Sequence, residues 1–145
     1  MDFMKEAITE SVKNLETGHG GPFGAVVVKD GKIVGRGHNE VIKNNDPTCH
    51  GEMQAIRDAC RNLGTYDLSG CDLYTSAPPC PTCLSAIIWA NIKTVYYGNT
   101  AKDTAAIGFR DDFIYQFIEN GCQNTDVLSL TQLDRDEANT IFAAY

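Results

Sequence analysis

The chain has 145 residues, of which 43% are hydrophobic and 21% are charged, and its formal net charge is −7. The length and the apolar content suit one domain over residues 1–145 with a single core, and they leave little room for a second. Because phosphate binding depends on positive charge, the acidic balance and the lack of a lysine or arginine cluster exclude nucleic acid as the expected partner.

The first half of the chain predicts a helix, a hairpin and a second helix. Apolar residues recur at helical spacing over residues 3–15, which is typical of an amphipathic helix. Residues 25–39 predict two strands around the turn Asp30-Gly31, a strong hairpin signal. After a loop, a second helix is expected to begin at about residue 47 or 48 and to end before Gly64, because helices favour glycine just past their last turn.

The second half alternates strands with helices. Apolar, β-branched and aromatic runs predict strands over residues 71–76, 94–98 and 126–130, and helical patterns cover residues 84–92, 112–121 and 135–144. Such alternation favours parallel pairing, after an antiparallel start in the hairpin. The sequence therefore predicts an α/β fold with three layers, α/β/α, around a central mixed sheet of five strands.

Six cysteines could serve as disulfides or as metal ligands. The first residues lack the basic-then-apolar pattern of a signal peptide, and no apolar run is long enough to cross a membrane, so we expect a cytoplasmic protein with no membrane contact. Thiols stay reduced in that compartment, and a chain of this size needs no disulfides to stabilise it. The six are Cys49, Cys60, Cys71, Cys80, Cys83 and Cys122.

Two of the cysteines form a Cys-x-x-Cys pair at a predicted helix start. Cys80 and Cys83 lie in PCPTC, where exposed helix N–H groups stabilise thiolates. Such a pair serves either as a redox couple or as two zinc ligands. His50 favours zinc, because it too opens a helix, and helices that follow neighbouring parallel strands begin at the same edge of a sheet. Three protein ligands and a water are the pattern of a catalytic zinc ion, whereas a structural zinc ion has four protein ligands.

Glu52 lies two residues after His50. On a helix these two side chains diverge by about 200°, so both cannot comfortably bind one metal ion. Glu52 can instead reach a substrate and the water that zinc activates. His-x-Glu followed by Pro-Cys-x-x-Cys is the signature of zinc nucleobase deaminases. A lone His-x-Glu is usually structural and a lone Cys-x-x-Cys is only moderately specific, but the two together favour catalytic zinc over a structural zinc site or a redox pair.

At these residues the chain resembles the cytidine deaminase superfamily, and the closer likeness is to its bacterial guanine deaminase branch. The matching runs are GGPFGAVVVKDGKIVGRGHN, NDPTCHGEMQAIRDACRNLGTY, LYTSAPPCPTCLSAIIWA and GFRDDFIY, so the likeness covers nearly the whole chain. It implies a five-stranded mixed sheet, one zinc ion per chain, and a homodimer in which the C-terminal tail can cross to the partner's active site.

Beyond the metal ligands and Glu52, the resemblance implies a second acidic residue and four substrate contacts. Asp111 would help the proton transfer or grip the amino group, and Asp112 is the alternative. The implied substrate contacts are Asn39 for the base, Phe23 and Trp89 for the planar ring, and Tyr145 in the covering tail.

Four departures from the family's pattern lie near the expected pocket. Gly51 stands where the family more often has alanine, a variant that also resembles the fungal type of cytosine deaminase. The family's Cys-Glu-Pro-Cys is Ala77-Pro78-Pro79-Cys80 here, Arg110 stands beside Asp111, and the tail is shorter. None of these departures changes a metal ligand or Glu52, so they bear on the substrate and not on the reaction class.

The sequence therefore predicts a zinc-dependent hydrolytic deaminase of a free nucleobase, with guanine giving xanthine and ammonia. A deaminase of cytosine, isocytosine or an aminotriazine is the alternative, and a non-enzymatic zinc-binding module is the alternative from another class. The acidic charge disfavours an RNA-editing adenosine deaminase. His19 and His38 lie beside glycines, and we expect solvated or hydrogen-bonded imidazoles there rather than ligands.

Overall fold

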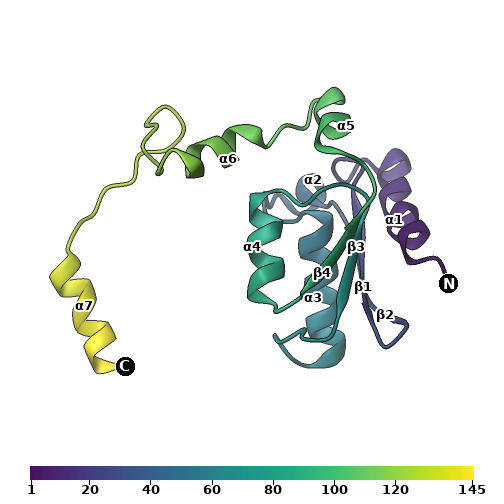
Figure 1. The fold of residues 1–145 in the computed structure, drawn as a ribbon, viewed down its shortest axis with the longest axis horizontal. Helices are drawn as coiled ribbons and strands as arrows, with labels where there is room; N and C mark the ends of the chain where they lie inside the picture. The colour runs from purple at the N-terminus through teal and green to yellow at the C-terminus, as the bar shows by residue number, and fades with distance from the viewer. The chain divides into compact units, whose positions relative to one another are not determined.

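The computed structural model describes the whole chain, residues 1–145, as two compact units, Met1–Arg110 and Asp111–Tyr145. The second unit contains α6 (Asp112–Glu119) and α7 (Arg135–Ala144). No helix combines the length and the apolar character that a membrane span requires. The elements of the first unit (Figure 1) are α1 (Phe3–Thr17), β1 (Gly24–Lys29), β2 (Lys32–His38), α2 (Val41–Asn44), α3 (Gly51–Leu63), β3 (Asp72–Thr75), α4 (Pro81–Trp89), β4 (Thr94–Tyr97) and α5 (Ala101–Ala106).

The sheet has four strands in the order β2-β1-β3-β4. β1 pairs antiparallel with β2 and with β3, and β3 pairs parallel with β4. This pairing confirms a mixed sheet with an antiparallel start and a parallel second half. The hairpin turn lies at Asp30 and Gly31, whose φ angles of 50° and 75° are the positive values that a type I′ turn requires.

The predicted fifth strand is absent, so the expectation of five strands is wrong. Residues 126–130 form a turn and irregular backbone, and they pair with no strand. Val127, Leu128 and Leu130 are 40%, 51% and 65% exposed. An apolar run becomes a strand only where a neighbouring strand supplies hydrogen bonds and where one of its faces is covered. Residues 126–130 have neither.

The start of α3 also differs from the prediction. α3 begins at Gly51, because the preceding loop forms hydrogen bonds of its own. The Asp46 carboxylate accepts the Thr48 N–H at 2.8 Å and the Thr48 hydroxyl at 2.6 Å. The four-residue helix α2, which the sequence did not reveal, precedes this loop. The loop therefore delivers His50 to the first position before α3.

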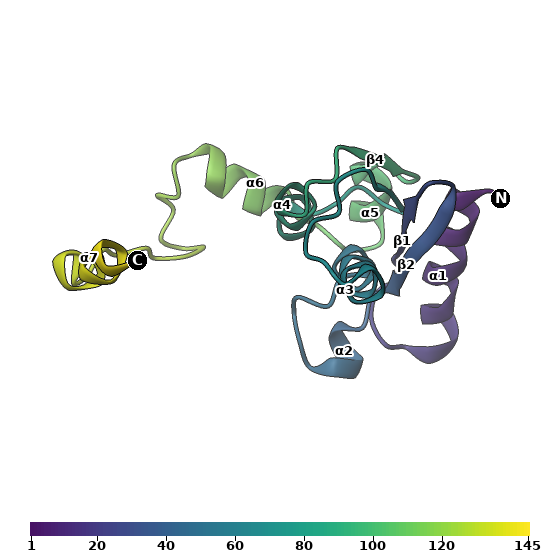
Figure 2. The same ribbon diagram turned by 90° about the horizontal axis from the view of Figure 1, so that it is seen from below.

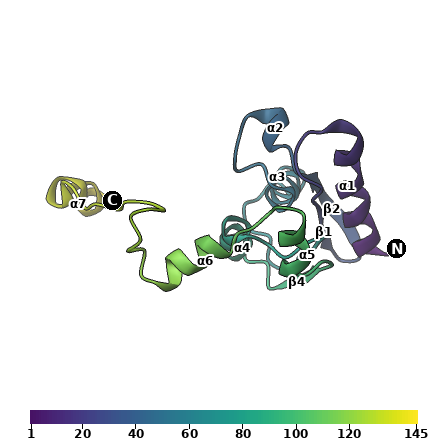
Figure 3. The same ribbon diagram turned by 90° about the horizontal axis from the view of Figure 1, so that it is seen from above.

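Helices cover both faces of the sheet in the first unit. Ala25 and Val27 of β1 pack in a core shared with α3 and α4. The alternate residues Val26 and Val28 pack with Ala7 of α1. Figures 2 and 3 show α1 on one side of the strands and α3 and α4 on the other. Because successive strand residues point to opposite faces, β1 contributes to two cores, and the first unit has three layers.

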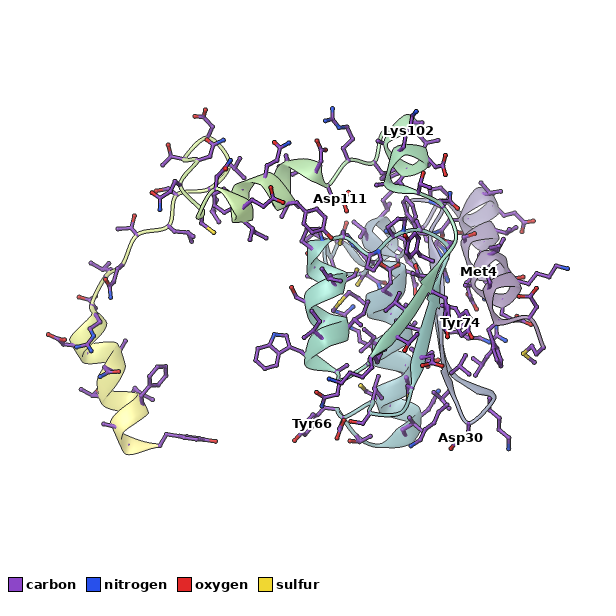
Figure 4. The ribbon with its side chains drawn as sticks, viewed as in Figure 1. Met4, Asp30, Tyr66, Tyr74, Lys102 and Asp111 are labelled. Atoms are coloured by element: carbon purple, nitrogen blue, oxygen red, sulfur yellow. The ribbon has the colours of Figure 1, made fainter.

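Aromatic side chains cover the sheet on the α1 side. Tyr74 of β3 stacks on Tyr96 of β4 with 4.7 Å between ring centroids, and it lies 5.4 Å from the ring of Phe3. Figure 4 shows Met4 and Tyr74 on this side of the sheet, where both pack against the buried residues of α1 and β1. α3 and α4 cover the opposite side of the sheet.

Gly37 of β2 allows α3 to lie directly against the sheet. A Cβ added at Gly37 would lie 2.4 Å from the Ala55 nitrogen and 2.7 Å from the Gly51 oxygen, both backbone atoms of α3. We expect Gly37→Ala to lower the free energy of unfolding by about 2–3 kcal/mol, because the added methyl group displaces backbone that cannot turn aside. Urea unfolding followed by circular dichroism measures the loss.

Gly31→Ala is the matched control for this prediction. A Cβ at Gly31 would meet no atom within 4 Å, so the substitution costs only the strain of a positive φ, about 1 kcal/mol. Equal losses for the two variants would contradict the close packing of α3 on Gly37.

Candidate active site

The candidate site lies at the edge of the sheet where β2 and β3 end and β1 begins. The strand register places Gly24 opposite His38 and Ala25 opposite Thr75, which brings these three strand ends together. α3 follows β2 after a loop, and α4 follows β3, so both helices begin at this edge. The two strands are not neighbours, because β1 lies between them. They share an edge because both run antiparallel to β1 and therefore in the same direction.

Three side chains converge at this edge with the spacing of metal ligands. The His50 Nδ1 atom lies 3.2 Å from the Cys80 Sγ and 3.4 Å from the Cys83 Sγ, and the two sulfurs are 3.7 Å apart. In a tetrahedral zinc site, two sulfurs lie about 3.8 Å apart, and a sulfur and a nitrogen lie about 3.6 Å apart. These three atoms therefore fit one zinc ion. No fourth histidine, cysteine or carboxylate belongs to the group, which matches the ligand count of a catalytic site.

The ends of two helices make these side chains available. His50 and Cys80 are the N-cap residues of α3 and α4, with extended backbone, and neither side chain caps its helix. Pro81 occupies the first helical position of α4, where its missing N–H costs nothing. Cys83 follows in the first turn and is fully buried. The exposed N–H groups of a helix start favour the thiolate form of the two cysteines.

The two thiols differ in how firmly they hold their protons. The hydrogen bond from Cys83, together with that from His50, lowers the pKa of Cys80 to about 4. The hydrogen bond to Cys80, together with burial, raises the pKa of Cys83 above its ordinary value. In the metal-free chain Cys80 is therefore a thiolate at neutral pH, and the Cys83 thiol donates to it.

We expect iodoacetamide to alkylate Cys80 before the other cysteines once a chelator has removed the metal. Because Cys80 ionises far below neutral pH, its rate should change little between about pH 6 and pH 8, whereas an ordinary thiol gains about tenfold per pH unit. Burial raises the pKa of Cys60 and Cys71, so these two thiols are internal controls. Mass spectrometry of the peptides gives the order of labelling. Earlier labelling of Cys60 or Cys71 would contradict the assignment.

Glu52 lies in the first turn of α3 and is 6% exposed. Burial raises the pKa of its carboxyl, and hydrogen bonds with Cys83 and Thr75 oppose this effect. The Thr75 hydroxyl lies 3.0 Å from Glu52 Oε1 and 3.0 Å from the carbonyl oxygen of Ala77. The Thr75 hydroxyl is the donor in both contacts, so its one proton is shared between the Glu52 carboxyl and the Ala77 carbonyl oxygen. The site thus holds a carboxyl that can keep a proton beside the metal ligands.

Phe23 and Asn39 lie beside the start of α3. The Asn39 N–H donates to the Phe23 carbonyl at 3.0 Å. Asn39 is 8% exposed, and its Oδ1 accepts the Val41 N–H at 3.0 Å. This bond fixes the amide so that its Nδ2 donor is the group left for a ligand. The Phe23 ring meets Phe109 edge to face, with 5.0 Å between the centroids.

Gly51 marks a close approach between α3 and β1. A Cβ added at Gly51 would lie 3.1 Å from the Phe23 oxygen and 3.2 Å from the Gly24 Cα. These are tight contacts with backbone atoms, so α3 begins closer to β1 here than an alanine at position 51 would allow. An alanine at this position would therefore require the backbone of Phe23 or Gly24 to move by a few tenths of an ångström.

The remaining predicted residues lie in other parts of the chain. Trp89 ends α4, about 9 Å along the helix axis from Cys83 in its first turn. Its side chain is 85% exposed, so the single chain does not bring it to the metal ligands. Asp111 and Tyr145 belong to the second unit, where Asp111 is the N-cap of α6 and Tyr145 follows α7 with its side chain exposed. Their roles at the site stay predictions.

The sequence did not reveal three residues that shape the site. Thr75 holds the Glu52 carboxyl, and Phe109 packs on the predicted Phe23. Asn14 of α1 is 7% exposed and donates to the Asn39 carbonyl at 2.9 Å. An asparagine within an amphipathic helix is a weak signal of such a buried hydrogen bond, and nothing local distinguishes Thr75 from other strand threonines.

Residues 1–99 of the chain match the family model described as the cytidine and deoxycytidylate deaminase zinc-binding region. Guanine deaminase of Bacillus subtilis is 49% identical over 125 residues, which are 86% of this chain and 80% of that protein. The tRNA-specific adenosine deaminase of Aquifex aeolicus is 42% identical over 100 residues, which are 69% of this chain and 66% of that protein. The X-ray structure of Bacillus subtilis guanine deaminase superposes with a TM-score of 0.90 and 46% identity, and the match covers 98% of this chain and 90% of that one.

Proposed function

Because the chain belongs to the cytidine and deoxycytidylate deaminase family, we propose that it is a zinc-dependent hydrolase that converts guanine to xanthine and ammonia. The observation that carries the proposal is the buried carboxyl of Glu52 beside a ligand set of one histidine and two cysteines. The choice of guanine rests on the likeness to a guanine deaminase over 98% of this chain. The likeness to the tRNA deaminase covers 69%, and the net charge of −7 disfavours an RNA substrate.

One zinc ion per chain is held by the His50 Nδ1 atom and the sulfurs of Cys80 and Cys83. When bound, zinc supplies a Lewis acid that activates water for attack at neutral pH. The ligand spacing of 3.2 to 3.7 Å supports this assignment. Complete burial of Cys83 protects one ligand from solvent and from oxidants.

Glu52 moves the protons of the reaction. Its carboxylate takes one proton from the attacking water and delivers it to a ring nitrogen of the base, then takes the second proton of that water from the new hydroxyl group and delivers it to the departing amine. In sum, guanine and water give xanthine and ammonia. Burial raises the pKa of Glu52, and a raised pKa suits a carboxyl that must both accept and release a proton near neutral pH. The bond to Thr75 at 3.0 Å keeps the carboxyl in one orientation throughout.

Asn39 and Phe23 bind the base. The free Nδ2 donor of Asn39 suits guanine, whose O6 and N7 atoms are acceptors. The ring of Phe23 offers an apolar face or edge for the planar purine. Asp111 adds the second acidic group, and Tyr145 closes the site from the tail.

The direct test assays guanine, guanosine, isocytosine, cytosine and aminotriazines side by side, with ammonia release as the readout. We expect guanine to be the preferred substrate and xanthine to be its product by chromatography. Ammonia from isocytosine or cytosine but not from guanine would overturn the substrate and keep the reaction class. Stoichiometric zinc with no ammonia from any base would favour a zinc-binding module.

The working form is a homodimer with exchanged C-terminal tails. Every residue of α7 is exposed, and Ile141 and Phe142 are 69% and 80% exposed. A helix of ten residues is marginal in water unless it packs on something. α4 also exposes Ile88 and Trp89, at 65% and 85%. Apolar surfaces of this kind suit burial against a second copy of the chain, and Trp89 then contributes to the subunit interface.

Mixed dimers test the tail exchange. Glu52→Gln subunits keep an intact tail, and Tyr145→Ala subunits keep an intact metal site and Glu52. If each tail covers the partner's site, mixing two nearly inactive variants should restore about a quarter of the wild-type activity, because half of the dimers then hold one complete site. Activity that stays at the sum of the separate variants would contradict the exchange.

The whole chain, residues 1–145, acts as one domain in the cytoplasm. All six cysteines are free thiols, which suits a reducing compartment. Limited proteolysis of the zinc-loaded protein tests the single domain, since a separable second unit would be released as a stable fragment.

A further inference from the structure

We propose that His19, His38 and Glu40 form a second transition-metal site, separate from the thiolate site. Their ligand atoms all lie within 4.8 Å of one another, and the His19 Nδ1 and His38 Nε2 atoms are 3.2 Å apart. Two nitrogens bound to one tetrahedral zinc ion lie about 3.3 Å apart. The two imidazoles are thus already spaced to share an ion.

The backbone holds these ligands from two separate segments. His38 ends β2, and Glu40 follows two residues later at the start of α2. The His19 carbonyl accepts the N–H groups of Ile42 and Lys43 at 2.9 and 3.1 Å, which ties the loop after α1 to α2. All three side chains are half-buried. The site is therefore built by the fold rather than by exposed side chains that meet by chance.

A buried carboxylate supports His38 from behind. Glu10 is 2% exposed, and its Oε2 atom lies 3.6 Å from the Nδ1 of His38, the ring nitrogen that does not face His19. Histidines that bind metals usually direct their second ring nitrogen to a carboxylate, and Glu10 lies on that side of His38, at ion-pair range rather than at hydrogen-bond distance. The Lys13 ammonium holds the same Glu10 oxygen at 2.8 Å. This outer carboxylate is a second feature typical of a metal site.

Glu40 is held in place from two sides. Its Oε1 accepts from the Gln54 Nε2 at 3.1 Å, and its Oε2 lies 3.1 Å from the Lys43 Nζ. Each oxygen of an ionised carboxylate accepts more than one partner, so the carboxylate can bind an ion without losing Gln54. Lys43 is 52% exposed and can turn into solvent when a cation arrives.

Two imidazoles and one carboxylate select the class of the ion. This donor set is found in zinc enzymes, whereas Mg²⁺ and Ca²⁺ prefer oxygen ligands alone. Without thiolates the site binds zinc less tightly than Cys80 and Cys83 do, so it fills second. In the metal-free chain the two ring nitrogens share a hydrogen bond across 3.2 Å, which zinc replaces.

Two ligands of the second site flank Asn39, because His38 and Glu40 are its neighbours in the chain. An ion bound there would fix the backbone of Asn39, whose carbonyl already accepts from Asn14 at 2.9 Å. Any benefit of this ion for substrate binding by Asn39 rests on the proposed function. The existence of the second metal site does not rest on it, and the test of the site needs no substrate.

The experiment titrates Zn²⁺ into full-length protein that already holds one zinc per chain, followed by calorimetry and by NMR of the imidazole rings. The chain has three histidines, His19, His38 and His50, so each ring signal can be assigned. We expect a second equivalent to bind, to shift the His19 and His38 signals, and to leave His50 unchanged. Mg²⁺ in place of Zn²⁺ should shift none of the three.

Two variants and one control complete the test. His38→Gln and Glu40→Gln should keep the first zinc and lose the second, a drop from two ions to one at saturation. Glu16→Gln, on the exposed face of α1, is the matched control and should bind two. If His38→Gln does not fold, the wild-type titration decides alone. Saturation at one zinc per chain, or a second zinc that shifts neither His19 nor His38, overturns the proposal.

Discussion

Glu52→Gln should lower guanine turnover by about 10⁴-fold, the upper end of what general acid–base catalysis contributes, while one zinc ion per chain stays bound. The upper end is expected because Glu52 handles the protons of more than one step. The amide has the shape of the carboxyl and can still bond to Thr75, but it cannot accept a proton. Ammonia release and zinc content, measured on the same sample, separate loss of chemistry from loss of metal.

Glu16→Gln removes the same charge from the exposed face of α1 and should leave the turnover unchanged. A Glu52→Gln enzyme that turns over guanine within about tenfold of the wild type would contradict the role of Glu52, because tenfold is less than a general acid or base contributes. Loss of zinc from this variant would instead show that Glu52 supports the metal site.

The same variant should also change stability in a definite direction with pH. Burial raises the pKa of Glu52 above its ordinary value of 4.5, so the folded metal-free chain holds this proton more tightly than the unfolded chain does. The stabilising contribution of the carboxyl is therefore present below pH 4.5 and is lost as the pH rises through the raised pKa. Metal-free Glu52→Gln should melt above the wild type at neutral pH, and the difference should shrink toward pH 4.5.

Cys83→Ser should abolish turnover and release the zinc ion. Loss of an outer partner of a metal ligand already costs 10–100-fold in affinity, so loss of the buried ligand itself should cost more than about 100-fold. Because the binding free energy of a metal adds to the stability of the folded chain, wild-type protein should melt at a lower temperature after chelation. The melting temperature of Cys83→Ser should be the same with and without chelator. Zinc analysis, the guanine assay and thermal unfolding provide the three measurements.

Cys60→Ser is the matched control for the ligand variant. Cys60 is a half-buried thiol near the end of α3, and it belongs to no metal-ligand group. This variant should lose some stability, because a hydroxyl replaces a thiol at the border of the core, but it should keep both zinc and turnover. Wild-type turnover in Cys83→Ser would contradict the ligand assignment.

The local patterns of the sequence predicted most of the first unit. The apolar spacing of residues 3–15 predicted α1, the turn at Asp30-Gly31 predicted the β1–β2 hairpin, and Gly64 ends α3 in a left-handed conformation. These features depend on interactions over one or two turns of chain. The strand expected at residues 126–130 failed because a strand needs a partner, and no local pattern shows whether a sheet edge is within reach.

The candidate site divides in the same way. The residue types and their spacing predicted His50, Cys80, Cys83 and Glu52, since a zinc site and a proton carrier demand these side chains and each stands at a helix start. The reason expected for their convergence was incomplete: the helices follow β2 and β3, which are separated by β1. Only the antiparallel pairing of β1 with both strands turns these helix starts to one edge.

The sequence by itself thus determined the chemistry that this chain can perform, because ligand identity and helix starts are written in short runs of residues. The tertiary structure decided which groups act together. It placed Thr75 against Glu52 and brought His19 to within 3.2 Å of His38. Both contacts join residues 19 or more positions apart. Such contacts depend on how strands pair and on what becomes buried, and these are properties of the whole fold rather than of any local run.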